Sequence, residues 1–591
     1  MSGQNMTRTK MNRTLSSLAL SAALLSTSCA LDTLEPCEGE TCENLDEKGL
    51  AIVGGSTAAA HAWPSAVGIW DTKYREVVLC GGTLVHPKWV LTATHCVNDL
   101  PLSEVELVLG TRDISGTTSG YRVTPIRSVL HATIDLALLE LPSRTSYRTS
   151  DWFTSGELAS VALTQPATAV GWGSTTGYYT EGASVPLLQQ VNLEFRGRGS
   201  ACNSFFPATS VPSSELCLGP GDALRDTCFG DSGGSPSFRF AGVWKNMGVV
   251  KSAGPVNGAG KFCANPGRPS LFTIPDVAWL KAQLPASEGK LRVERSDGLG
   301  NTTLQSTKAG TSSHADIIVV GQFAAGALGD VLQFDARAGS FTVQKASDTA
   351  VLTTLAAQTG LPIGLTLIGR GKINGDAYDD LIVFDAVNKR LRAYSANAAG
   401  TGVFTALGTG LVVADGSLRN LIVGKFDSDT NLDFMTYSPS LGEGRFYEVS
   451  SAGTIKLVRA NSGWNRDWEI IFSGNYSPDS LDDLVFYAPR TGLVRFWSTD
   501  GAGSTKTKFK ETSWNRDWQH ILPGAFGGNS YSDLFFYNPR TGITKAYSTD
   551  GAGNISLLRG ETWAKTWSRV VSGQFGGTSH TDVVLYDRWG H

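Results

Sequence analysis

Three residues in the first half of the chain have the types and surroundings that nucleophilic catalysis requires. Ser232 lies among glycines, His95 lies in a Thr-His-Cys segment, and Asp135 stands inside an apolar run. A serine hydroxyl is a weak nucleophile at its own pKa and needs a base, and imidazole titrates near neutral pH. A carboxylate in an apolar run is costly unless it is paired, and orienting the imidazole would pair it. Together these residues predict a serine nucleophile, a histidine base and an aspartate partner, although a histidine or aspartate taken alone is more often structural.

Motifs around these residues occur in one order and resemble the trypsin/chymotrypsin family of serine endopeptidases over residues 52–284. The histidine lies in Leu91–Cys96, the aspartate in Ile134–Leu139, and the serine in the nine residues Asp226–Gly234. The resemblance implies a trypsin-like double β-barrel that hydrolyses proteins or peptides and needs no cofactor for catalysis. Apolar residues at helical spacing predict a closing helix over Pro275–Leu284.

The resemblance assigns a role to each catalytic candidate. His95 is the general base, Asp135 orients it and Ser232 is the nucleophile, as in a Ser-His-Asp triad. The backbone N–H groups of Gly230 and Ser232 form the oxyanion hole, which stabilises the charge that develops in the transition state. Thr94 departs from the pattern, because the family usually has alanine there.

The segment Ile52–Gly55 resembles the N-terminus that family members acquire when a pro-segment is removed. The resemblance implies that the freed ammonium of Ile52 pairs with Asp231, so that one peptide cleavage switches the enzyme on. Residues 31–51 would then be the pro-segment. Because Ala51 and not a basic residue precedes the cut, we expect another protease to activate the chain. The alternative is that the segment is simply a first strand and turn.

The residues expected around the specificity pocket follow the family less regularly. Asp226 resembles the carboxylate that selects Lys or Arg side chains, because a buried charge is costly until a cation fills the pocket. An alignment with one inserted residue places Ser252 and Gly254 at the substrate-pairing strand and the pocket wall. Ser270 stands where the family usually has a second wall glycine, and would narrow the pocket. We therefore expect cleavage after Lys or Arg, with the preference between the two left open.

All nine cysteines lie at or before Cys263, so the chain is divided by composition. The resemblance implies three disulfides, Cys80–Cys96, Cys202–Cys217 and Cys228–Cys263. Cys37 and Cys42 could close a small loop in the pro-segment or pair between molecules. The even number of cysteines that remains without Cys29 suits an oxidising compartment.

Residues 1–30 have the pattern of a signal peptide, with basic residues, the apolar run Leu15–Leu25 and then small residues. The run is shorter than the roughly 20 residues that span a bilayer. We therefore expect a secreted, extracellular protein. Cys29 leaves a second interpretation open, because it lies where a bacterial lipoprotein is lipidated, and lipidation would anchor the protein at the cell surface.

Residues 289–591, after a linker at 285–288, repeat with a period of about fifty residues. Each repeat begins near a glycine, and an aspartate follows nine residues later in five repeats and eleven residues later in the second. The pairs are Gly321 with Asp330, Gly369 with Asp380, Gly424 with Asp433, Gly474 with Asp483, Gly524 with Asp533, and Gly573 with Asp582. Short alternating strands separated by turns predict a β-propeller of six blades. The first and last segments should share one blade, which leaves no open edge.

These repeats resemble the FG-GAP or VCBS type, in which an acidic turn binds calcium. Lys372 and Lys425 stand at an expected ligand position, which argues against an ion that takes about six to eight oxygens. The calcium candidates that remain are Asn374, Asp376, Asp380, Asp427, Asp429 and Asp433. The alternative is that the aspartates cap their turns through backbone hydrogen bonds.

Late repeats carry pairs of tryptophans, which are Trp464 with Trp468, Trp514 with Trp518, and Trp563 with Trp567. Exposed tryptophans would stack on a carbohydrate or grip a protein at a surface. Aromatic residues that recur once per blade more often pack between neighbouring sheets, and we favour that interpretation.

The composition is that of a folded protein, with 41% hydrophobic and 18% charged residues, and its 67 glycines favour an all-β chain with many turns. A net charge of -4 without a basic stripe argues against nucleic acid as a partner. We expect a secreted serine endopeptidase, made as a zymogen, whose propeller recognises a substrate or a surface ligand. The alternative from another class is an inert protease-like protein that binds carbohydrate or protein through its propeller.

Overall fold

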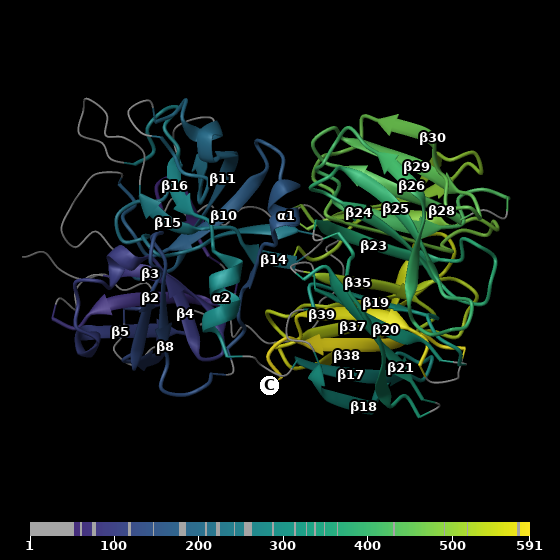
Figure 1. The fold of residues 1–591 in the computed structure, drawn as a ribbon, viewed down its shortest axis with the longest axis horizontal. Coiled ribbons are helices and arrows are strands. Elements are labelled where there is room, and N and C mark those ends of the chain that lie inside the picture. Colours follow the sequence, from purple (N-terminus) through teal and green to yellow (C-terminus); the bar gives the residue numbers. More distant parts are fainter. Residues whose placement is uncertain are drawn as a thin grey trace, which may run out of the picture. The chain divides into compact units, whose positions relative to one another are not determined.

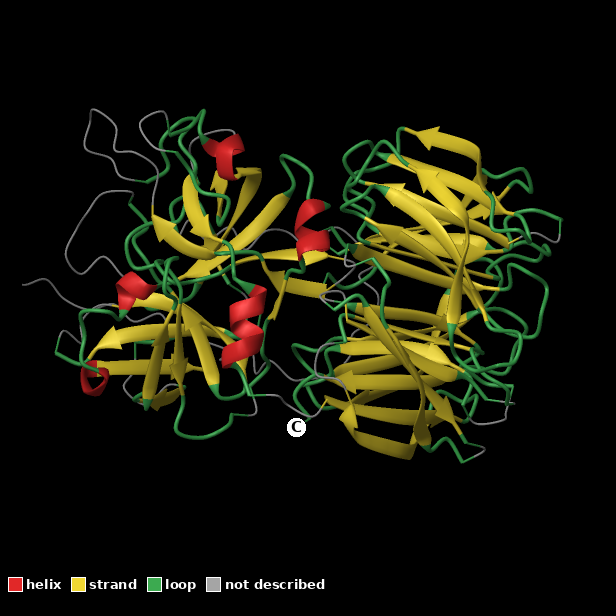
Figure 2. Cartoon of the chain, viewed as in Figure 1, coloured by secondary structure: helices red, strands yellow, loops and turns green. Residues whose placement is uncertain are grey.

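The computed structural model describes residues 52–590, apart from 59–61, 74–77, 116–119, 146, 177–184, 207–209, 220–224, 241–242, 253–262, 286–288, 312–314, 327, 336–337, 348, 363, 430–431, 490, 517 and 576–578. The predicted signal peptide, the pro-segment with Cys37 and Cys42, Cys29, and Gly254 therefore lie outside the described residues. Strands dominate the structure and helices are few, so the chain is all-β as expected (Figure 2).

Residues 52–284, called here the first half, form two sheets of a trypsin-like double β-barrel (Figure 1). One sheet has the order β6 (Tyr121–Val123), β5 (Val105–Leu109), β2 (Ala66–Asp71), β3 (Val78–His86), β4 (Trp89–Thr92), β8 (Ala137–Glu140) and β7 (Arg127–Leu130). All of its pairs are antiparallel. Its apolar side chains converge on one buried cluster, because strands such as β4 and β8 carry almost only apolar residues.

The second sheet has the order β15 (Val249–Ser252), β16 (Ser270–Thr273), β12 (Glu215–Gly219), β11 (Gln189–Arg198), β10 (Pro166–Gly171), β13 (Pro236–Phe240), β14 (Val243–Asn246) and β9 (Asp151–Trp152), with β1 (Ser56–Thr57) on β11. Only the β14–β9 pair is parallel. The described 3-10 helices are η1 (Thr94–Cys96), η2 (Leu102–Glu104) and η3 (Gly199–Cys202). The three disulfides join the pairs that the resemblance implied, Cys80–Cys96, Cys202–Cys217 and Cys228–Cys263.

Two short α-helices belong to the first half. The N-terminus of α1 (Ser155–Ala159) has a capping box, in which the side chains of Thr154 and Glu157 bond to each other's backbone N–H. The helix predicted over Pro275–Leu284 is present as α2 (Val277–Gln283), which begins after Asp276 because that carboxylate accepts the first free N–H groups. Among the described residues no helix is long and apolar enough to cross a membrane.

The second half, residues 289–590, forms the predicted six-bladed propeller, with six four-stranded antiparallel sheets. Five blades are continuous in sequence. The first contains β19 (Ile317–Gly321), β20 (Asp330–Asp335), β21 (Ser340–Ala346) and β22 (Leu352–Gln358), and the second contains β23 (Leu365–Gly371), β24 (Asp380–Asp385), β25 (Arg390–Ala396) and β26 (Phe404–Val412). The third contains β27 (Asn420–Gly424), β28 (Leu432–Ser438), β29 (Glu443–Val449) and β30 (Ile455–Ser462), and the fourth contains β31 (Ile470–Gly474), β32 (Asp483–Ala488), β33 (Leu493–Thr499) and β34 (Thr505–Ser513). The fifth contains β35 (His520–Gly524), β36 (Asp533–Tyr537), β37 (Ile543–Thr549) and β38 (Ile555–Thr562).

The sixth blade closes the ring as predicted. It combines β17 (Gly289–Ser296) and β18 (Thr302–Thr311) from the start of the propeller with β39 (Arg569–Gly573) and β40 (Asp582–Asp587) from its end. β17 pairs with β40 from Lys290 opposite Asp587 to Glu294 opposite Val583. Backbone hydrogen bonds between the two ends of the propeller thus replace an exposed edge.

The register corrects one assignment made from the sequence. Gly371, and not Gly369, lies opposite Asp380 in the second repeat, while Gly321 lies opposite Asp330 in the first. All six glycine–aspartate spacings are therefore nine residues. The sequence alone did not distinguish Gly369 from Gly371, because residues two apart on a strand face the same side of the sheet.

The paired tryptophans pack between blades, as we favoured from the sequence. Trp468 is 2% exposed and lies in a cluster that joins apolar residues of β28 and β29 to those of β31 and β32. Trp518 and Trp567 are buried in equivalent clusters. Their partners in each pair, including Trp464, are half-buried beside them. The tryptophans therefore contribute to blade packing.

Replacing Trp468 by alanine should lower the free energy of unfolding by about 3 to 5 kcal/mol, because it leaves a cavity between two blades. Leu457 on β30 is exposed, so Leu457→Ala should change that free energy by less than about 0.5 kcal/mol. Denaturant unfolding followed by far-UV circular dichroism measures both. Equal effects of the two substitutions would contradict a packing role for Trp468.

Candidate active site

His95 and Asp135 are brought together by the pairing of two strands. His95 lies in η1 directly after β4, Asp135 lies just before β8, and Thr92 of β4 is opposite Ala137 of β8. The Asp135 carboxylate lies 2.8 Å from Nδ1 of His95 and also accepts the backbone N–H of His95 at 3.0 Å. An acceptor at Nδ1 favours the proton on that nitrogen, which leaves the Nε2 lone pair available as a base.

Asp135 is held in its ionised form. Burial by itself would raise the pKa of its carboxyl, but hydrogen bonds from the side chain and backbone of His95 and the positive charge of Lys251 lower it overall. The ionised carboxylate can therefore stabilise a protonated His95. The Thr94 hydroxyl donates to the carbonyl of Leu136 at 2.7 Å and so joins the histidine and aspartate segments. Sequence reasoning recorded Thr94 as a departure from the family but missed this function.

The Ser232 loop packs against β3 and β4. The carbonyl of Ser232 accepts the N–H of Gly81 in β3 at 2.7 Å. Gly233 has a φ of +78°, and a Cβ there would lie 2.1 Å from the hydroxyl oxygen of Thr92. Only glycine permits this approach. Because Thr92 is three residues before His95, the packing brings the Ser232 loop to the histidine segment.

Two backbone N–H groups of this loop donate to no acceptor among the described residues. The N–H groups of Asp231, Gly233 and Gly234 donate to backbone carbonyls at 2.9–3.0 Å. Those of Gly230 and Ser232 meet no acceptor within the part of the chain that the structure describes. Two N–H groups two residues apart in a turn are thus available to a developing oxyanion.

The buried carboxylate of Asp226 is surrounded by donors. Ser270 donates its hydroxyl to Oδ1 at 2.7 Å, the backbone N–H of Thr227 donates to the same oxygen at 2.9 Å, and that of Ala264 donates to Oδ2 at 2.9 Å. Ser270 therefore contacts the carboxylate of Asp226 directly, which the sequence did not indicate. Ser252 is exposed at the end of β15.

The two residues expected to act in activation are both buried. Ile52 is fully buried among apolar side chains, and the carbonyl of Val53 accepts the N–H of Asp226 at 3.0 Å. Asp231 accepts the N–H groups of Cys228 at 2.8 Å and Gly173 at 2.9 Å. Burial raises the pKa of Asp231 to about 7, against the effect of these hydrogen bonds. No cation contacts Asp231 among the described residues.

The aspartates of the propeller turns accept backbone hydrogen bonds. Asp433 accepts from Phe426 and Asp427 at 3.0 Å, and Asp380 accepts from Ile373 at 2.7 Å. Equivalent bonds to turn N–H groups are made by Asp330, Asp483, Asp533 and Asp582. Capping of the turns is therefore a function that these residues already have.

The calcium candidates are only partly clustered. Carboxylate oxygens of Asp427, Asp429 and Asp433 lie within 4.8 Å of one another. Asn374 instead uses its amide to bond Asp376 at 2.9 Å. Calcium in these turns stays a prediction.

Comparisons with known proteins identify the family of the first half. Residues 52–278 match the family model described as Trypsin. Chymotrypsin-like elastase family member 1 of Homo sapiens is 30% identical over 255 residues, which cover 40% of this chain and 92% of that protein. The same-named protein of Canis lupus familiaris is 29% identical over 252 residues, which also cover 40% and 92%. The chain belongs to the trypsin/chymotrypsin family of serine proteases.

Membership of this family supports proteins or peptides as substrates. The three disulfides and the family are consistent with a secreted or extracellular protein. The family match ends at residue 278, before the propeller begins.

Asp231 makes the stability of the chain with an intact Ala51–Ile52 bond dependent on pH. Its pKa in the folded state is about 7, above the ordinary 3.8, so folding binds a proton between these values. The stabilisation is complete below the lower pKa and is lost as pH rises through about 7. Between pH 5 and pH 8 the free energy of unfolding of the uncleaved chain should fall by on the order of 2 kcal/mol relative to that of the Asp231→Asn variant.

Chemical denaturation of both proteins at each pH, in a Ser232→Ala background, measures this difference. Asp113→Asn is the control, because hydrogen bonds from Ser115 lower the pKa of that exposed carboxyl. The difference in free energy of unfolding between Asp113→Asn and the Ser232→Ala protein should not change between pH 5 and pH 8. A flat difference for Asp231→Asn would show that the Asp231 carboxyl is already ionised.

Proposed function

We propose that this protein is a secreted serine endopeptidase that uses Ser232 as nucleophile, His95 as general base and Asp135 to orient the imidazole. One observation carries the proposal. The Asp135 carboxylate bonds to both Nδ1 and the backbone N–H of His95, beside a loop whose Gly230 and Ser232 N–H groups have no acceptor among the described residues. This arrangement supplies a base, its counter-charge and a site for an oxyanion.

The reaction would proceed in two halves. Nε2 of His95 takes the proton of Ser232 Oγ as this oxygen attacks the substrate carbonyl, and the N–H groups of Gly230 and Ser232 bind the oxyanion. The imidazolium then gives its proton to the leaving amine, and the acyl group stays on Ser232. Water, deprotonated by the same nitrogen, attacks the acyl group. The bond between the acyl carbon and Ser232 Oγ then breaks, the imidazolium returns the proton to Oγ, and the carboxylic acid is released.

Ser232→Ala should abolish peptide hydrolysis and labelling by a fluorophosphonate. Asp135→Asn should lower kcat by about 10⁴-fold, because the imidazole loses its correct tautomer. Asp113→Asn, an exposed carboxyl outside the site, should leave both unchanged. Steady-state kinetics and labelling of the chain that begins at Ile52 provide the measurements. If this chain is neither active nor labelled, the alternative of an inert binding protein is favoured.

Activation would follow from cleavage before Ile52 by another protease. The new ammonium would supply the buried cation that Asp231 lacks, and so lower the pKa of that carboxyl and hold the loop from Cys228 to Ser232. The burial of both Ile52 and Asp231 supports this step.

Cleavage after Lys or Arg is the proposed specificity, on the basis of the buried Asp226. Ser270 complicates the recognition, because its hydroxyl already donates to the carboxylate and occupies space that a glycine would leave open. A cationic substrate must therefore compete with, or add to, that hydrogen bond. The propeller would present a substrate or surface ligand to the protease, with calcium in the Asp427 turn as a further proposal.

Ser270→Gly should raise kcat/KM for Arg- and Lys-ending peptide substrates, and Asp226→Ser should lower it by at least about 100-fold, because the cation loses its counter-charge. Asp276→Ser is the matched control, because it removes a carboxylate at the start of α2 while the serine hydroxyl can still cap the helix. Kinetics with Arg-, Lys-, Ala- and Phe-ending peptides distinguish the outcomes. Faster cleavage of Ala- or Phe-ending peptides by the unmodified enzyme would reject the Lys/Arg specificity while leaving the catalytic proposal intact.

A further inference from the structure

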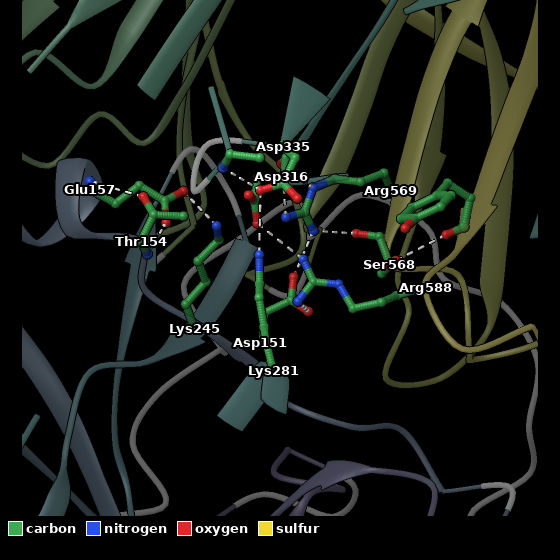
Figure 3. Close-up of polar contacts among 12 residues, drawn as sticks. Asp151, Thr154, Glu157, Lys245, Lys281, Asp316, Asp335, Ser568, Arg569 and Arg588 are labelled. Carbon is green, nitrogen blue, oxygen red and sulfur yellow. Dashed lines mark hydrogen bonds and ion pairs between the residues drawn. The ribbon is translucent and has the colours of Figure 1, made fainter. Parts of the chain in front are cut away.

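Two arginines of the propeller bind one buried aspartate of the first half (Figure 3). Asp151 in β9 receives Arg569 from β39 at 2.8 Å and Arg588, just after β40, at 3.2 Å. All three side chains are largely buried. Burial would raise the pKa of Asp151, but Arg588 and Arg569 lower it well below its ordinary value. Asp151 is thus a charged group whose partners come from more than four hundred residues later in the chain.

A second carboxylate belongs to the same network. Asp316 of the propeller lies 3.4 Å from Arg588, and its backbone carbonyl accepts two hydrogen bonds from Arg569 at 3.2 and 3.3 Å. Arg588 therefore lies between the two carboxylates, and Arg569 joins the carboxylate of Asp151 to the backbone of Asp316. Buried charges are tolerated only when they are paired and hydrogen-bonded, and removing one partner leaves the others uncompensated.

The residue after Arg588 enters the apolar core of the first half. Trp589 is 4% exposed and belongs to the cluster formed by β3, β4 and β8. Its ring meets His86 edge-on at 4.7 Å, and its Nε1 donates to the Thr149 hydroxyl at 3.0 Å. Arg144 donates to its backbone carbonyl at 2.9 Å. A large apolar side chain with its one donor satisfied is typical of an anchor residue.

Further contacts surround these residues. Arg540 of the propeller lies over the rings of Trp63 and Trp244, at 4.8 and 5.4 Å. Lys281 of α2 pairs with Asp335 at 3.4 Å. None of the contacts described here involves His95, Asp135 or Ser232.

We propose that Arg569, Arg588 and Trp589, called here the C-terminal clasp, dock the propeller permanently on the first half of the same chain. The partner of this propeller surface is the protease itself, so the two halves stay together without the covalent linker. A desolvated charge network beside a buried tryptophan supplies both the specificity and the burial of a stable interface. The propeller is then docked rigidly on the protease and is not attached only through a flexible linker.

Cleavage of the linker tests the proposal on the full chain. A recognition sequence for a site-specific protease is placed at residues 286–288 in a Ser232→Ala background, and the cleaved protein is diluted to about 1 μM in 0.15 M salt. At this concentration a complex with a nanomolar Kd stays intact. We expect one species of the full mass by analytical ultracentrifugation. Two species with the masses of the separate halves would overturn the proposal.

Substitutions then identify the residues responsible. Trp589→Ala and Arg588→Ala should each raise the Kd of the cleaved halves at least about tenfold, since each removes a buried anchor. Trp589→Phe keeps an aromatic ring but loses the donor to Thr149. Its Kd should lie between that of Trp589→Ala and that of the unsubstituted protein.

Matched controls lie on β38 of the same propeller. Arg559 pairs with Glu561 at an exposed site and Leu557 is 55% exposed, so Arg559→Ala and Leu557→Ala should leave the Kd unchanged. Clasp substitutions with no more effect than these controls would show that another surface holds the halves together. The mass measured for the linker-cleaved protein with an unsubstituted clasp tests the proposal even if a variant fails to fold.

Discussion

The apolar cluster of β3, β4 and β8 supports the candidate active site and also receives the propeller. It contains Leu91 and Ala93, which lead to His95, and Leu136, which follows Asp135. It also contains Trp589 from the end of the propeller. Because protein cores are close-packed, the positions of these side chains constrain one another. The bond between Asp135 and His95 therefore depends on packing to which distant parts of the chain contribute.

The carboxylates of Asp135, Asp151, Asp226 and Asp231 in the first half are stabilised in different ways. His95 holds Asp135 ionised, two arginines hold Asp151 ionised, and Ser270 with backbone N–H groups surrounds Asp226. Among the described residues only backbone N–H groups donate to Asp231, and burial raises its pKa. No cation contacts Asp231 among the described residues, and Asp231 is the carboxylate for which we propose that a new N-terminus supplies the charge.

Local motifs predicted much of the fold and of the site. The segments around His95, Asp135 and Ser232 indicated the protease fold because the loops that carry them need particular residues, such as the glycine at 233 that leaves room for Thr92. Regular spacing predicted six blades and their closure. The register at Gly371 and the contact of Ser270 with Asp226 could not be predicted, because each depends on which residues of separate strands lie opposite each other.

The sequence by itself determined the family, the all-β class and the repeat, since these depend on local residue types and on periodicity along the chain. The tertiary structure decided which groups meet across long separations. Nothing adjacent to Asp151 indicates that Arg569 and Arg588 will neutralise it, and nothing around Trp589 indicates that it completes the core of the first half. Such contacts arise only when folding brings surfaces together, because burial and charge pairing depend on distance in space and not on position along the chain.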